Sequence, residues 1–183
     1  MKTAIHYLEW LVEQMGGLAR LCVLALVLLV ATNVILRYLF SIGPVSLQEF
    51  EWHLVSPIAL LGLAYSMKHR AEVRIDFLYE RFSLKGQAVV NIFSSLLTVA
   101  IGVIIVWLSF HYVVQSYQLN EGSPDPGGLT MRYLLKAFIP LGFLLLVVQG
   151  SADIMRGLVQ FIDPSNVLEQ ANSLASETKN DCA

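Results

Sequence analysis

The chain has 183 residues, 56% of them hydrophobic and 14% charged, with a formal net charge of −2 at pH 7. Soluble domains carry about 25% charged residues, so this composition predicts a protein whose main solvent is the lipid bilayer. The near-neutral charge gives no reason to expect a nucleic-acid partner. Membrane spans of about 20 residues each leave no room for a separate catalytic domain.

The first segment, residues 1–17, has the pattern of an amphipathic helix on the cytoplasmic membrane surface. Ile5 and Leu8 lie on one side of such a helix, whereas Glu9 and Glu13 lie on another. These carboxylates stand where a secretory signal would carry basic residues. We therefore expect the first apolar segment to remain in the protein as an anchor.

A four-helix transmembrane domain is predicted over residues 18–158, because four apolar segments are bracketed by ionisable side chains. The 35 residues from Gly86 to Asn120 contain no Asp, Glu, Lys or Arg, which indicates a membrane-spanning helix. A polar cytoplasmic tail follows at residues 159–183. The predicted spans cover residues 18–40, 47–68, 86–115 and 132–155.

Charge in the loops predicts the orientation. The loop at residues 68–85 carries five Lys and Arg residues, whereas the loop at residues 111–130 carries none. The positive-inside rule places the 68–85 loop, which also has the pattern of a short surface helix, in the cytoplasm. With four spans, both termini are then cytoplasmic. The predicted fold class is an all-α membrane protein with four transmembrane helices and short amphipathic interfacial helices.

The second span is expected to begin near Leu47, because Ser46 and Glu49 have the spacing of a capping box. Arg37 ends the first span a short loop earlier, so an ion pair with Glu49 is expected at the outer interface. The alternatives are contact of these residues with a partner protein and a role in handling protons or substrate. Asn33 lies one turn before Arg37 on the same helix face and would extend this polar patch into the bilayer.

A stripe of small and polar residues is expected on the third span. Asn91, Ser95, Thr98 and Gly102 recur at spacings of three or four, which places them on one face of a helix. Small residues of this kind favour close helix contact in membranes, so the stripe is interpreted as a packing face. The alternative is the lining of a permeation path, although the stripe contains no ionisable group.

Enzymatic activity is not expected, because the sequence contains no nucleophile motif, phosphate-binding loop or metal-ligand spacing. No metal or other cofactor is expected either. His53 and His111 fall near the outer ends of spans, which keeps open a haem-binding electron-transfer subunit. A self-sufficient small transporter is the other alternative, but the chain offers no charged pathway of its own.

Five blocks of residues occur in an ordered set: Asn33, Arg37, Tyr38 and Phe40; Ser46, Glu49 and Trp52; Leu61, Gly62 and Ala64; Arg74, Ile75 and Asp76; then residues 123–129, Arg132 and residues 134–150. This set resembles the small membrane subunit of tripartite ATP-independent periplasmic (TRAP) transporters. The resemblance covers roughly residues 19–156. One position departs from the family pattern, since Glu72 stands where many members have a histidine four residues before the matching aspartate.

The resemblance implies a sodium-coupled secondary transporter that imports organic acids across a bacterial inner membrane. In this family the large membrane subunit holds the substrate and sodium sites, and the small subunit is a scaffold beside it. The expected partners are that large subunit, a periplasmic substrate-binding protein that touches the outer loops, and membrane lipids. The candidate interface or structural residues are Asn33, Arg37, Ser46, Glu49, Trp52, Arg74, Asp76, Asn91, Ser95, Thr98, Gly102, Arg132 and Lys136.

Overall fold

The computed structural model describes residues 2–69, 71 and 82–162, and in these ranges it contains four α-helices and no β-strand. The expected all-α fold is thus confirmed for this part of the chain. Glu72, Arg74, Asp76, the surface helix predicted around them and most of the polar tail lie outside the described residues. The helices are α1 (Lys2–Phe40), α2 (Val45–Lys68), α4 (Leu84–Gln118) and α5 (Arg132–Ile162).

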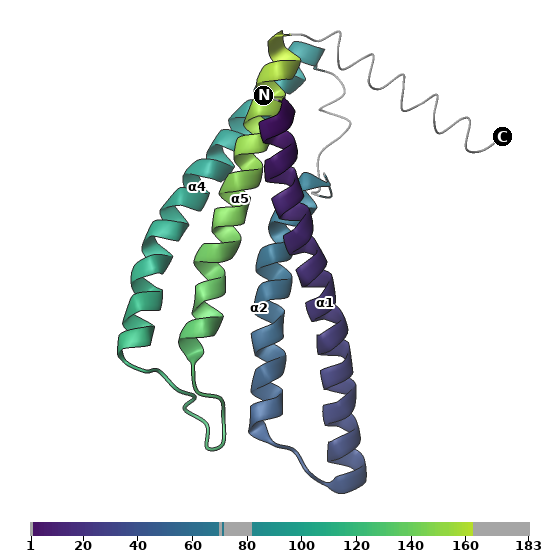
Figure 1. Ribbon diagram of the computed structural model, residues 1–183, viewed down its shortest axis with the longest axis vertical. Helices are drawn as coiled ribbons and strands as arrows, with labels where there is room; N and C mark the ends of the chain where they lie inside the picture. The colour runs from purple at the N-terminus through teal and green to yellow at the C-terminus, as the bar shows by residue number, and fades with distance from the viewer. Residues whose placement is uncertain (1, 70, 72–81, 163–183) are drawn as a thin grey trace, which may run out of the picture.

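The helices form two antiparallel hairpins, α1 with α2 and α4 with α5 (Figure 1). α5 packs against α2 and joins the hairpins, so the order across the row is α4, α5, α2 and α1. The helices converge at the end that carries the N-terminus, here called the terminal end, where α1 also reaches α5. They diverge at the opposite end, called the loop end, which carries residues 41–44 and 119–131.

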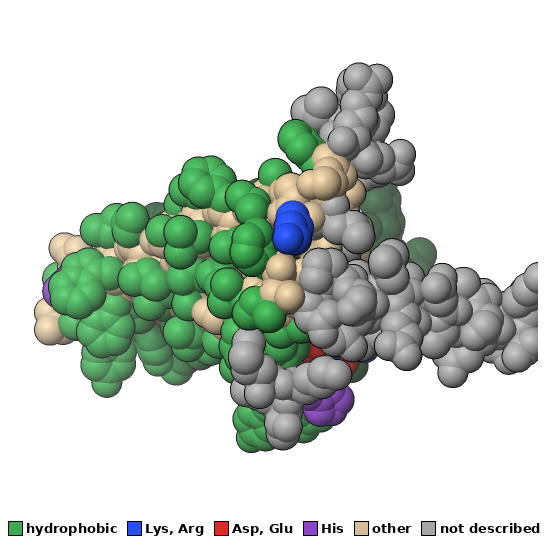
Figure 2. Space-filling model, turned by 90° about the horizontal axis from the view of Figure 1, so that it is seen from above, with side chains coloured by type: hydrophobic (Ala, Val, Ile, Leu, Met, Phe, Trp, Pro, Cys, Tyr) green, Lys and Arg blue, Asp and Glu red, His purple; other side chains and the backbone are tan. Residues whose placement is uncertain are grey.

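Three of the helices, α1, α4 and α5, are long and apolar enough to cross a membrane. Hydrophobic side chains cover most of the described surface visible in Figure 2. Large apolar side chains are exposed in the bundle as a whole, for example Leu28 at 68% and Trp107 at 72%. Exposed apolar surface of this kind is typical of helices that face lipid or a partner protein. The first turns of α2 carry Glu49, Glu51 and His53 among apolar residues. The assignment of α2 as a fourth span stays a prediction.

α1 is one continuous helix, so the segment predicted at residues 1–17 and the predicted first span form a single element. Gly16 does not interrupt this helix but lies against α2, where an added Cβ would be 2.0 Å from Tyr65 Cδ2. A glycine therefore allows this close approach of the two helices. Val12, one turn earlier, is fully buried with Leu61 of α2 in a small core. The N-terminal segment is thus packed on the bundle.

Small side chains line the contact between α4 and α5. An added Cβ at Gly102 of α4 would be 2.6 Å from Val147 Cγ2, and one at Gly150 of α5 would be 2.9 Å from Val99 Cγ2. In α4 the small buried residues recur every seven positions, a repeat that keeps one side of a helix against its partner. The repeat consists of Ala88, Ser95, Gly102, Ser109 and Ser116.

The capping box predicted at the start of the second span is wrong. α2 begins at Val45, Pro44 is its N-cap residue, and no side chain caps the helix. Ser46 therefore lies inside the first turn. Glu49 accepts hydrogen bonds from the 119–131 loop instead of reaching back to the helix end. The spacing of Ser46 and Glu49 predicted the start of the helix to within two residues. It did not predict the hydrogen-bond partners of Glu49.

Candidate functional site

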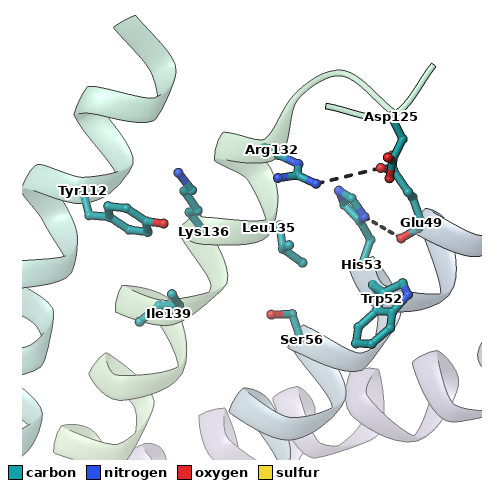
Figure 3. Close-up of a pocket in the computed structure, with 10 residues that line it drawn as sticks. All are labelled: Glu49, Trp52, His53, Ser56, Tyr112, Asp125, Arg132, Leu135, Lys136 and Ile139. Carbon is teal, nitrogen blue, oxygen red and sulfur yellow. Dashed lines mark hydrogen bonds and ion pairs between the residues drawn. The ribbon is translucent and has the colours of Figure 1, made fainter. Parts of the chain in front are cut away.

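A cavity of about 520 Å³ lies at the loop end, among α2, α4, α5 and the 119–131 loop. Its volume is within the range of small-ligand sites. Figure 3 shows charged and polar side chains in the upper part of this cavity, and Ser56 and Ile139 below them. The lining residues are Glu49, Trp52, His53, Ser56, Tyr112, Asp125, Arg132, Leu135, Lys136 and Ile139.

Glu49 fastens the 119–131 loop to α2. Its carboxylate accepts hydrogen bonds from Ser123 Oγ and from the main-chain N–H of Leu129. Gly128 passes so close that an added Cβ would be 2.7 Å from Glu49 Oε2. Charge-assisted bonds to a carboxylate are stronger than neutral ones, so this one side chain fixes both arms of the loop.

Glu121 fastens the same loop to α4 and α5. Lys136 Nζ donates to its carboxylate, and Ser116 Oγ donates to Oε2 at 2.6 Å. The Lys136 ammonium also lies 4.0 Å from the centre of the Tyr112 ring, a cation–π contact. The bond from Lys136, followed by that from Ser116, holds the pKa of the Glu121 carboxyl below its ordinary value of 4.5.

Acidification is expected to release this attachment. Because the pKa of Glu121 is lowered, its ion pair is complete at neutral pH and is lost only as the pH falls below 4.5 through the lowered value. A nitroxide label on Pro126→Cys, with Cys22 and Cys182 replaced by serine, should gain mobility in that range. Glu121→Gln should show this mobility already at neutral pH. A wild-type label whose mobility stays constant well below pH 4.5 would contradict the prediction.

A second polar cluster, at the terminal end, ties α1 to its neighbours. Glu13 of α1 accepts a hydrogen bond from Lys68, and His69 Nε2 lies 3.2 Å from the same carboxylate. Glu9, one turn earlier, forms an ion pair with Arg156 of α5. Charge is thus gathered at both ends of the bundle, where a membrane protein meets water.

The predicted ion pair between Arg37 and Glu49 is wrong. Arg37 is exposed and pairs with no residue of the described ranges. The carboxylate of Glu49 points toward the 119–131 loop on the α5 side of α2, whereas α1, which carries Arg37, lies on the opposite side of α2. Asn33 donates to Glu51 Oε1 at 2.9 Å and so links α1 to α2. The polar patch expected between the first two spans therefore contains Asn33 and Glu51.

The structure brings together four of the predicted site residues, Glu49, Trp52, Arg132 and Lys136, around the cavity. Trp52 is 74% exposed at its rim. The remaining described residues of the predicted set lie elsewhere. Asn33 and Arg37 are on α1, and Ser46 is in the first turn of α2. On α4, Ser95, Thr98 and Gly102 lie at the contact with α5, and Asn91 is half-buried one turn from Ser95.

Sequence reasoning missed the loop residues that build the site. Glu121, Ser123 and Asp125 supply the contacts and part of the lining described above. The available signal was that Glu121 and Asp125 are the only charged residues between Lys85 and Arg132. Two isolated carboxylates in a turn next to a basic helix start are natural candidates for pairing with it.

His53 and His111 do not share a site. His53 lines the cavity, and its Nδ1 lies 2.8 Å from the main-chain oxygen of Glu49. His111 is exposed and lies beside the rings of Trp107 and Phe110. Within the described ranges, no group of three or more His, Cys, Asp or Glu residues is placed to hold a metal ion. The haem alternative gains no support from this geometry.

Long helices with exposed apolar side chains, tied at both ends by clusters of charge, define a multi-pass helical membrane protein. Residues 26–160 match the family described as tripartite ATP-independent periplasmic transporters, DctQ component. The match includes parts of all four described helices. The chain belongs to this family.

A relative from Halomonas elongata is described as the ectoine TRAP transporter small permease protein TeaB. It is 28% identical over 127 residues, which make up 67% of this chain and 65% of the relative. The match therefore spans less than two thirds of the relative's length. Together with the family match, it confirms the resemblance to small subunits of TRAP transporters that the ordered residues predicted.

Proposed function

We propose that this chain is the small, fixed membrane subunit of a binding-protein-dependent secondary transporter and that it packs beside a large permease subunit. Membership of the family supports a place in such a complex. The observation that carries the scaffold role is the distribution of side chains around α4. One side of α4 is small and packed against α5, and the opposite side is apolar and exposed.

The exposed side, called the α4 outer face, consists of large apolar residues at spacings of three and four. Their exposed fractions run from 48% for Leu97 to 63% for Leu108. α4 stands at one end of the row, so no other described helix covers this side (Figure 1). The face is therefore available to lipid or to a partner helix. Its residues are Phe93, Leu97, Ile101, Ile104 and Leu108.

The transport chemistry is assigned to the partners. The 35 residues from Gly86 to Asn120 contain no Asp, Glu, Lys or Arg, so the part of α4 after Lys85 offers no carboxylate for coupling to a cation. By the family resemblance, the large subunit holds sodium and cargo, and a soluble binding protein delivers an organic acid. The name of the relative gives ectoine as its cargo, which makes ectoine the first compound to test beside simple carboxylates.

We place the chain in a bacterial inner membrane with four spans and both termini in the cytoplasm. The five basic residues at positions 68–85, against none at 111–130, support this orientation. The loop end then faces the periplasm. In this orientation the 119–131 loop, held by Glu49 and Glu121, is the part of the described structure best placed to touch the binding protein.

Bulky substitutions on the α4 outer face should separate the complex. Lipid tails accommodate a tryptophan, whereas a packed protein contact does not. We therefore expect Ile101→Trp with Ile104→Trp to reduce recovery of a large permease with the affinity-purified chain about tenfold. Leu24→Trp, on the exposed side of α1, is the matched control and should leave recovery unchanged. If Leu24→Trp reduces recovery of the permease and the α4 substitutions do not, the interface lies on α1. If no permease is recovered with the wild-type chain, the proposed function is wrong.

A further inference from the structure

The cavity contains one cation and one anion whose bonding capacity the described residues leave largely unused. Arg132 is 37% exposed, and its one ion-pair contact among the described residues is Glu49 Oε1 at 3.9 Å, beyond hydrogen-bond range. Its guanidinium N–H donors are therefore available. The Asp125 main chain holds the loop turn, but its carboxylate has no hydrogen bond or ion pair with any described residue.

The other charges of the cavity are already engaged within the chain. The Glu49 carboxylate is taken up by Ser123 and Leu129, and Lys136 donates to Glu121. The free groups that remain are thus a guanidinium and a carboxylate on neighbouring parts of the same cavity (Figure 3). A ligand that matches both must carry a negative and a positive charge.

The lower part of the cavity has a different character. From Glu49 to Ser56 the wall follows α2 for seven residues, or about 10 Å along the helix. Leu135 and Ile139, one turn apart on α5, provide apolar surface there, and Trp52 stands at the rim with its ring exposed. Tryptophan is enriched where a membrane meets water. The cavity therefore combines a charged upper part with an apolar lower part.

We propose that this cavity binds the head group of a zwitterionic phospholipid from the leaflet around the loop end. Its phosphate lies on Arg132, whose planar guanidinium suits phosphate oxygens, and its ammonium lies on Asp125. The acyl chains follow Leu135 and Ile139 away from the loop. An anionic head group without an ammonium would bring no positive charge to Asp125, so its phosphate would face the carboxylates of the cavity without the compensation that an ammonium provides. This inference rests on the membrane character of the chain and is independent of its role as a transporter subunit.

Native mass spectrometry of the delipidated full-length chain tests the proposal, with dioleoyl phosphatidylethanolamine and dioleoyl phosphatidylglycerol as probes. The wild type should bind one phosphatidylethanolamine about tenfold more tightly than phosphatidylglycerol. Arg132→Gln should weaken this binding about tenfold, the usual size of a lost charge-assisted contact. Asp125→Asn should remove the preference between the two lipids. Arg37→Gln, an exposed arginine at the same end, is the control and should behave as wild type.

Four results would overturn the proposal. If the wild type binds the two lipids equally, the site does not select a zwitterionic head group. If Arg132→Gln binds the lipid as tightly as the wild type, Arg132 does not hold the phosphate. Displacement of the lipid by an equal concentration of soluble glycerophosphoethanolamine would indicate a water-soluble ligand. If Arg132→Gln no longer recovers the large permease but binds lipid as the wild type does, the cavity receives a side chain of the permease and not a lipid. Thermal melting curves should be recorded for Arg132→Gln and Asp125→Asn. If they match the curve of the wild type, misfolding is excluded as the cause of weaker lipid binding.

Discussion

Replacement of Gly142 by valine is expected to destabilise the protein by about 1–3 kcal/mol, the usual cost of overpacking a filled contact. Gly142 lies where α5 meets α2, and an added Cβ would be 2.6 Å from Leu60 Cβ and 3.0 Å from the main-chain oxygen of Leu60. A backbone atom cannot rotate out of the way as a side chain can. The two helices must therefore move apart, and their contact is the most extensive of the helix contacts that join the hairpins.

Gly62→Val is the matched control for this experiment. Gly62 lies in α2 and has no atom within 4 Å of an added Cβ. Both substitutions replace a helical glycine by valine, so the change in helix propensity is shared. Thermal unfolding followed by circular dichroism in detergent should show a lower melting temperature for Gly142→Val alone. An equal loss in both variants would show that the α2–α5 contact is not tightly packed.

Much of the fold follows from the hydrophobic pattern. Long apolar segments bounded by charge predicted helices at the observed places, and the end of α4 at Gln118 lies within three residues of the predicted end of the third span. The continuity of α1 was not foreseen, because two adjacent glycines, Gly16 and Gly17, normally weaken a helix. Tertiary packing accounts for Gly16, which provides the close contact with Tyr65.

The candidate site was predictable only in part, because its contacts join residues far apart in the chain. Glu49 was singled out from its place at the start of a span, but local spacing pointed to Ser46 and Arg37 as its partners. The structure gives it Ser123 and Leu129. No helical period relates a residue of α2 to a loop that follows α4, so the partner depends on how the two hairpins are joined.

Alanine in place of Glu49 is expected to free the 119–131 loop and thereby reduce uptake. The substitution removes the acceptor for Ser123 Oγ and for the Leu129 N–H, while the attachment through Glu121 to Lys136 remains. If the loop then keeps its present shape only about a tenth of the time, a partner that recognises this shape binds about tenfold more weakly. Uptake of the cargo by the reconstituted three-component transporter should fall by that factor at limiting binding protein.

Arg37→Ala is the control for this prediction, since Arg37 lies at the same end of the bundle but pairs with no described residue. It should leave uptake unchanged. Recovery of the large permease with Glu49→Ala should equal that of the wild type, because the α4 outer face is untouched, and excess binding protein should restore most of the lost uptake. Loss of permease recovery would instead place Glu49 at the contact between the membrane subunits. Normal uptake at limiting binding protein would show that the shape of the loop does not matter for transport.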